Sequence, residues 1–184
     1  MIDRTLKVLL LEDLPTDQIL VKRQVLKFAP NTLFSTANSR ESFEEQINWT
    51  HFDVILSDYK LPAYTGLDAL QFVRKHQAHV PFIFITGTMN DEERAAKSIL
   101  SGASGYLLKS NLKTLPKVME EVLEKSREIF EAEEARRQEQ ARKERLTQKL
   151  IAKIKMLPEN AERAELLDIA EELAGENIEL QTLA

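Results

Sequence analysis

Phe52-Asp53-Val54-Ile55-Leu56-Ser57-Asp58 is the stretch that decides the fold. Its nearly continuous run of β-branched, aromatic and other apolar side chains is typical of a strand buried on both faces of a parallel sheet. Since a buried unpaired charge is very costly, we expect Asp58 at the carboxyl edge of the sheet, open to solvent. Open α/β proteins bind their ligands at this edge. An alternative interpretation is that Asp58 only caps the turn that follows.

Short apolar runs alternate with segments of helical spacing on both sides of this stretch. Strands are predicted at 6–11, 33–37, 52–58, 81–85 and 105–108. Helices are predicted at 15–30, from an N-cap at Ser39, at 66–76, at 91–100 and from about Thr114. Strand–helix alternation of this kind indicates an α/β fold, a doubly wound parallel sheet with helices on both faces. Five strands and five helices complete one domain by about residue 127.

The composition limits the classes of protein to which the chain can belong. The 184 residues include no cysteine, which excludes disulfides and thiolate metal sites, and only three histidines. The net charge of −5 argues against a surface that binds nucleic acid. No apolar run approaches the roughly 18 residues of a membrane span, and no signal peptide is recognisable. We therefore expect a cytoplasmic protein that binds neither nucleic acid nor membrane.

Polar residues follow four of the predicted strands. They are Glu12 and Asp13 after the first, Asp58 after the third, Thr86 after the fourth and Lys109 after the fifth. Strand ends are often polar, so Thr86 or Lys109 alone could be purely structural. Because the ends of parallel strands share one edge of the sheet, however, the five side chains can converge on one crevice.

This set of side chains suits phosphoryl transfer. Carboxylates favour Mg²⁺, which Asp13 and Asp58 would ligate directly and Glu12 directly or through water. A carboxylate can also attack a phosphoryl group to give an aspartyl phosphate. Lys109 would then neutralise one phosphoryl oxygen while the Thr86 hydroxyl donates to another, which is the positioning and charge stabilisation that phosphoryl transfer requires.

About two thirds of the chain, from residue 5 to about 127, resembles the receiver domain of two-component response regulators. The matching segments are 8–13 (VLLLED), 54–58 (VILSD), Leu61-Pro62 with Gly66-Leu67, 85–87 (ITG) and 102–109 (GASGYLLK). The resemblance implies a flavodoxin-like sheet of strand order 2-1-3-4-5. It also implies that Asp58 is the phosphoacceptor, and that Glu12, Asp13, Asp58 and the Lys60 carbonyl hold Mg²⁺.

The resemblance further implies that Thr86 and Lys109 contact the phosphoryl group and that Tyr106 is an aromatic switch coupled to Thr86. Tyr106 could instead simply be packed on its strand. One departure from the family pattern is Ser110, which stands where the family usually has a proline after a cis peptide bond. Either Lys109–Ser110 is cis despite the cost of a cis bond without proline, or the loop is rebuilt.

A receiver domain of residues 1–127 leaves residues 128–184 as a helical extension. No glycine or proline occurs between Pro116 and Pro158, so a stalk helix is expected to about residue 157, with a short second helix at about 160–174. The heptad seam from Leu115 to Leu157 is apolar at both ends and polar in the middle, which favours a coiled coil with a weak centre. The alternative is a solvated, partly frayed helix.

The extension lacks histidine, and from Glu128 its acidic residues outnumber its basic ones, 14 to 9. We therefore expect neither a phosphotransfer domain nor a DNA-binding domain in the extension. The first functional hypothesis is a response regulator that a histidine kinase or phosphotransfer protein phosphorylates at Asp58. The face formed by the fourth helix, fifth strand and fifth helix would then change homodimerisation or partner binding.

Two other functions compete with this hypothesis. The chain could be a scaffold or adaptor that keeps the receiver fold, dimerises through the extension and needs no phosphorylation. It could also be an enzyme with an aspartyl intermediate, but such enzymes need a cap or a second acid two residues after the nucleophile, where this chain has Lys60. We therefore expect a phosphoacceptor with self-catalysed phosphotransfer and dephosphorylation rather than an enzyme.

Overall fold

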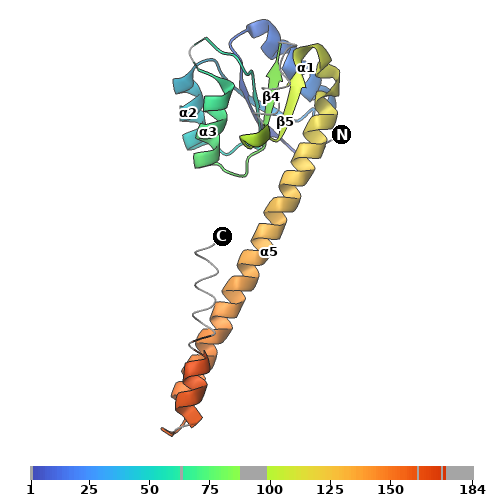
Figure 1. Cartoon of the computed structure of the whole chain (residues 1–184). Coiled ribbons are helices and arrows are strands. Elements are labelled where there is room, and N and C mark those ends of the chain that lie inside the picture. Colours follow the sequence, from blue (N-terminus) through green and yellow to red (C-terminus); the bar gives the residue numbers. More distant parts are fainter. Residues whose placement is uncertain (1, 63, 88–98, 161, 171, 173–184) are drawn as a thin grey trace. The chain divides into compact units, whose positions relative to one another are not determined.

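The computed structural model describes residues 2–62, 64–87, 99–160, 162–170 and 172 (Figure 1). The chain divides into two compact units, Met1–Glu128 and Ile129–Ala184, which are described separately below.

The first unit is built on a five-stranded sheet. Its strands are β1 (Lys7–Leu11), β2 (Leu33–Ala37), β3 (Val54–Ser57), β4 (Phe82–Thr86) and β5 (Gly105–Leu108). All four pairings are parallel, and the strand order is β2-β1-β3-β4-β5. The predicted doubly wound sheet of order 2-1-3-4-5 is therefore confirmed.

The described helices are α1 (Pro15–Phe28), α2 (Arg40–Trp49), α3 (Gly66–His76) and α5 (Leu115–Lys155), with a short 3₁₀ helix η1 at Lys109–Thr114. Their starts follow local sequence signals. Pro15 occupies the first turn of α1, where no backbone donor is needed. Ser39 caps α2 through a reciprocal pair of hydrogen bonds with Ser42, and Thr65 caps α3 in the same way.

The two faces of the sheet are covered by different helices, as Figure 1 shows. Val8 and Leu10 of β1 belong to one core cluster, which α1 and α5 complete. Leu9 and Leu11 belong to a second cluster, together with residues of α2 and α3. The alternation of side chains along a strand places successive residues on opposite faces, so residues 8–11 of β1 are all apolar because both faces are buried there.

Several predicted boundaries change. The first helix ends at Phe28 instead of residue 30, and the strand predicted at 52–58 is only Val54–Ser57. It starts later because the carboxylate of Asp53 binds Arg4 and the Lys7 N–H. The helix η1 was not predicted. All described peptide bonds are trans, so Lys109–Ser110 is trans and leads into η1. The helix predicted at 91–100 lies largely outside the described residues.

The second unit contains the part of α5 beyond residue 128, which ends at Lys155 rather than about 157. Residues 162–170 are helical, and the Asn160 side chain accepts the Arg163 N–H at 2.8 Å, as an N-cap does. Ile154 and Ala170 are buried, whereas apolar residues at 129, 130, 146 and 150 are exposed. The predicted end of the second helix and its apolar tail lie in 173–184, outside the described residues. None of the helices that the structure describes is sufficiently long and apolar to span a membrane.

Candidate functional site

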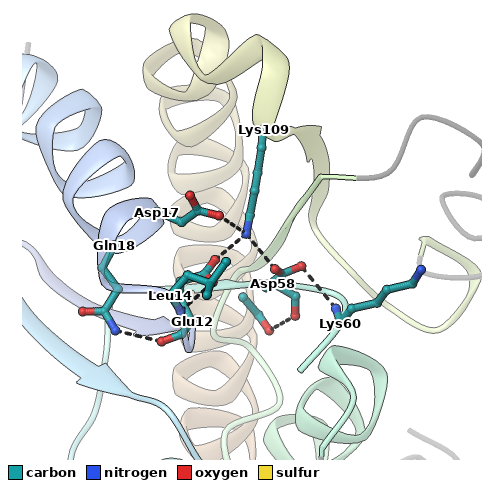
Figure 2. A network of polar contacts seen from close by, with 8 residues as sticks. Glu12, Leu14, Asp17, Gln18, Asp58, Lys60 and Lys109 are labelled. Carbon is teal, nitrogen blue, oxygen red and sulfur yellow. Dashed lines mark hydrogen bonds and ion pairs between the residues drawn. The ribbon is translucent and has the colours of Figure 1, made fainter. Parts of the chain in front are cut away.

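Polar side chains from four strand ends lie at the carboxyl edge of the sheet. Glu12 follows β1, Asp58 follows β3, Thr86 ends β4 and Lys109 follows β5. Figure 2 shows the Lys109 side chain extending to Glu12 and Asp58, with Asp17 of α1 beside them. The Lys109 ammonium nitrogen lies 2.7 Å from Glu12 Oε2, 2.7 Å from Asp58 Oδ2 and 2.6 Å from Asp17 Oδ2. The topology thus joins groups separated by up to 97 positions into one cluster.

Asp58 is fixed by both its backbone and its side chain. Its N–H donates to the Leu11 carbonyl at 2.9 Å, which continues the pairing of β3 with β1 beyond the strand. Oδ1 accepts the Lys60 N–H at 3.1 Å, and the backbone carbonyl accepts the Ser57 hydroxyl at 2.7 Å. Asp58 is only 8% exposed. Its carboxylate therefore has a defined position and a cationic partner, which the interpretation as a simple turn cap does not require.

Glu12 is the most deeply buried acid of the site, at 1% exposed. Oε1 accepts the Leu14 N–H at 3.2 Å, while Oε2 pairs with Lys109. Gln18 of α1 donates to the Glu12 backbone carbonyl at 2.8 Å. Burial raises the pKa of the Glu12 carboxyl, and the hydrogen bonds from Lys109 and Leu14 only partly oppose it. Both oxygens of Glu12 are thus already engaged.

Lys109 compensates the negative charge of the cluster. Burial alone would lower the pKa of its ammonium, but hydrogen bonds to Asp17, Asp58 and Glu12 outweigh burial and raise the pKa. Asp17 was not among the predicted site residues, because it lies within the first turn of α1 and follows no strand. Its position three residues after Leu14, at the start of the helix, was the one available signal.

The other two predicted metal-binding residues flank the cluster. Asp13 follows Glu12 and is half-buried. Lys60 forms an isolated antiparallel bridge with Thr65 and binds Asp58 through its N–H. The β3–α3 turn thus places its backbone next to Asp58.

Thr86 and Tyr106 lie on neighbouring strands. Thr86 is opposite Leu108, and Tyr106 is opposite Phe84. Because Phe84 and Thr86 are two positions apart, Thr86 and Tyr106 share one face of the sheet. Thr86 is buried, and Tyr106 is half-buried against the core cluster that α2 and α3 cover. The arrangement gives the two predicted switch residues adjacent positions along that face.

A metal ion was expected among these acids. Within the described residues, no group of three or more acidic, histidine or cysteine side chains is arranged to hold one. The Lys109 ammonium lies among Glu12, Asp17 and Asp58 instead. Three carboxylates and one ammonium nevertheless leave two negative charges, and all the acceptors are oxygens. The site therefore fits a hard divalent cation in charge and donor type.

Known proteins that are similar to this chain include response regulators and chemotaxis proteins. The family model of the response regulator receiver domain matches residues 8–120. The probable C4-dicarboxylate response regulator DctR of Bacillus subtilis is 30% identical over 103 residues, which are 56% of this chain and 45% of DctR. The chain thus matches less than half the length of that relative. Chemotaxis protein CheY of Pseudomonas aeruginosa is 24% identical over 128 residues, 68% of this chain and 97% of CheY.

Solved structures agree on the fold. The receiver domain of sensor histidine kinase PA1611 of Pseudomonas aeruginosa superimposes with a TM-score of 0.57 at 20% identity, covering 65% of this chain and 98% of that domain. That structure has a magnesium ion coordinated in its active site cleft. At this identity the similarity shows the fold alone.

Proposed function

The chain belongs to the response regulator receiver domain family, and on that basis we propose that it is a phosphorylation-activated response regulator of a two-component system. Residues 1–127 act as the receiver and residues 128–184 as a helical extension. The observation that carries the proposal is the Lys109 ammonium, 2.7 Å from Asp58 Oδ2 at the ligand-binding edge of the sheet. Asp58 is therefore our candidate phosphoacceptor.

The proposed reaction uses residues that already face one another. An Asp58 carboxylate oxygen attacks the phosphorus of a phosphohistidine on a kinase or phosphotransfer protein, the P–N bond breaks, and the imidazole leaves with the electron pair. Lys109 binds one phosphoryl oxygen, and the Thr86 hydroxyl donates to another. Since Lys109 is held by three acids beforehand, little reorganisation is needed as charge develops. The chain acts only on its own phosphoryl group and is not otherwise an enzyme.

Mg²⁺ is the proposed cofactor. Glu12, Asp13, Asp58 and the Lys60 carbonyl would hold it, since all offer oxygen ligands at the same edge. When bound, Mg²⁺ neutralises charge on the phosphoryl oxygens during transfer. The net charge of the cluster and the magnesium ion in the structure of the Pseudomonas receiver domain support this assignment.

Exposed apolar residues at the start of α1 favour this helix as the surface that a phosphodonor protein contacts. Leu14, Ile19 and Leu20 are 50%, 65% and 49% exposed, although α1 begins beside the site. A partner that covers them would bury apolar area while bringing its phosphohistidine to Asp58.

Phosphorylation is proposed to act on the face made by the fourth helix, β5 and α5. Thr86 moves toward the phosphoryl group and Tyr106 turns inward beside it. Leu115 and Met119 anchor the first turns of α5 in the receiver core, and the same helix continues to Lys155. A shift at this face therefore has a covalent route to the extension. We expect it to change homodimerisation, through the extension or this face, or the binding of a partner.

Intact mass spectrometry tests the proposal. The native chain and Asp58→Asn are incubated with acetyl phosphate, with and without Mg²⁺. We expect a gain of one phosphoryl group in the native chain only, and only with Mg²⁺. If the folded native chain gains nothing and also binds no beryllofluoride, the phosphoacceptor role is wrong. Light scattering of the phosphorylated and unphosphorylated chains then tests for a change in oligomer size.

One observation favours the scaffold alternative. The Lys109 ammonium pairs with Glu12, Asp17 and Asp58 at once, so these acids already have a cationic partner within the chain. A scaffold would bind Mg²⁺ feebly and dimerise identically with or without phosphodonor. Isothermal titration with Mg²⁺, compared with Asp58→Asn, separates the two functions.

A further inference from the structure

Asp17 is a fourth acid at the site, in addition to Glu12, Asp13 and Asp58. Its Oδ2 lies 2.6 Å from the Lys109 ammonium nitrogen, and its side chain is 23% exposed, against 16% for Lys109. It projects from the first turn of α1, a different element from those that carry the strand-end acids. Figure 2 shows it approaching the ammonium from the side opposite Asp58.

The hydrogen-bonding capacity of Lys109 gives Asp17 a specific role. An ammonium group has three N–H donors, and three carboxylates accept them here. When a phosphoryl group occupies Asp58, the bond to that carboxylate is exchanged for one to a phosphoryl oxygen. Two acids then remain to orient Lys109, namely Glu12 and Asp17.

Glu12 holds Lys109 and, in the proposed function, also binds Mg²⁺. Its Oε1 accepts the Leu14 N–H and its Oε2 pairs with Lys109, so a cation that binds either oxygen competes with a bond that Glu12 already makes. If Glu12 gives up its bond to Lys109, Asp17 is the acid of the cluster that still holds the ammonium beside Asp58. The Asp17 carboxylate binds the Lys109 ammonium, as Figure 2 shows.

We propose that Asp17 is a positioning residue that holds the Lys109 ammonium toward Asp58 while Glu12 exchanges its ligands. The inference rests on the proposed function of Asp58 and deepens it. It predicts that the first turn of α1 controls the orientation of Lys109, which follows β5. Asp17 does not contact the phosphoryl group and acts through Lys109 alone.

The test uses the full chain and two independent measurements. The first is the NMR signal of the Lys109 ammonium in ¹⁵N-labelled protein with Mg²⁺ and no phosphodonor, assigned by its loss in Lys109→Arg. The second is the rate of phosphorylation by acetyl phosphate, followed by intact mass. The variants are Asp17→Asn, Asp17→Glu and Glu41→Gln, which removes an exposed acid at the start of α2 and serves as a charge control.

We expect Asp17→Asn to broaden or abolish the protected ammonium signal and to slow phosphorylation on the order of tenfold, the factor for one lost charge-assisted hydrogen bond. Asp17→Glu should restore both, and Glu41→Gln should match the native chain. The inference is overturned if Asp17→Asn keeps the ammonium signal, whatever its rate, or if Glu41→Gln slows phosphorylation equally. If the native chain accepts no phosphoryl group, the proposed function fails, and the ammonium signal alone decides whether Asp17 positions Lys109.

Discussion

Replacing Gly66 with alanine tests how closely the phosphoacceptor is packed. Gly66 begins α3, and its N–H donates to the Tyr59 carbonyl at 3.0 Å, which closes the turn after β3. An added Cβ would press on the Asp58 backbone carbonyl oxygen and would lie 2.7 Å from Phe84 Cε1 and 3.1 Å from Ser57 Oγ. Two of these atoms belong to rigid groups, a backbone carbonyl and a buried ring. The backbone around Asp58 must therefore shift.

The loss of stability that we expect for Gly66→Ala follows from these contacts. Overpacking a well-filled core costs about 1–3 kcal/mol, and the higher helix propensity of alanine returns at most about 1 kcal/mol. Displacing the Asp58 carbonyl also weakens its 2.7 Å hydrogen bond from Ser57. We expect Gly66→Ala to lower the free energy of unfolding by about 1–2 kcal/mol. Moving the Asp58 backbone should also slow phosphorylation by acetyl phosphate.

Urea unfolding at pH 7, followed by circular dichroism, measures the change, and Gly87→Ala is the matched control. Among the residues that the structure describes, a Cβ at Gly87 would meet only the Lys109 Cδ, at 3.8 Å, which is ordinary van der Waals contact. Gly87→Ala should therefore keep the stability of the native chain within about 0.5 kcal/mol. Equal stability of Gly66→Ala and Gly87→Ala would refute the packing argument.

Three further predictions concern charged side chains that make hydrogen bonds within the receiver unit. The Arg74 guanidinium donates to the backbone carbonyls of Gly102, Ala78 and Val80. Arg74→Met should therefore lower the free energy of unfolding by about 2–3 kcal/mol in urea titrations, whereas Lys75→Met, at an exposed position, should leave it unchanged. The pKa of Lys109 is raised above 10.5, so its ion pairs stabilise the folded chain fully below that pH. This stabilisation is lost as the pH rises through the folded-state pKa, and the free energy of unfolding of Lys109→Met should therefore decline less steeply at alkaline pH. The pKa of Glu12 is raised above 4.5, so between 4.5 and the folded-state pKa the folded chain binds a proton that the unfolded chain lacks. The free energy of unfolding should therefore rise as the pH falls toward 4.5, and Glu12→Gln should remove this rise.

The fold was predictable because its signals are local. Continuous apolar runs such as Val54–Leu56 identify buried strands, and caps such as Ser39 identify helix starts. Parallel strands with helical crossovers then place every strand end at one edge, so Glu12, Asp58 and Lys109 were expected to meet. The sheet order itself came from the resemblance to a family, since alternation leaves several orders open.

The role of Asp17 was not predictable from the sequence, because it depends on the rotation of α1 about its axis. Asp17 reaches Lys109 only because α1 turns that side of its first turn toward the site, and no strand-end rule specifies this rotation. The 3₁₀ helix after Lys109 was missed for a similar reason. Residues 110–113 carry no cap or proline signal, and their conformation is set by the packing of Leu112 against the core.

The ion pairs of Lys109 hold three acids close together at the edge of the sheet. Three acids in mutual proximity would repel one another, and the buried Glu12 would favour its neutral form. The ammonium offsets part of this repulsion, and the cluster keeps two negative charges that would attract a cation. A cation that binds Glu12 would compete with the bonds that its two oxygens already make, to Leu14 and to Lys109. On the proposed function, the affinity of the site for Mg²⁺ would then include the cost of weakening one of these bonds. Asp17 lowers that cost because it keeps the ammonium bonded during the exchange.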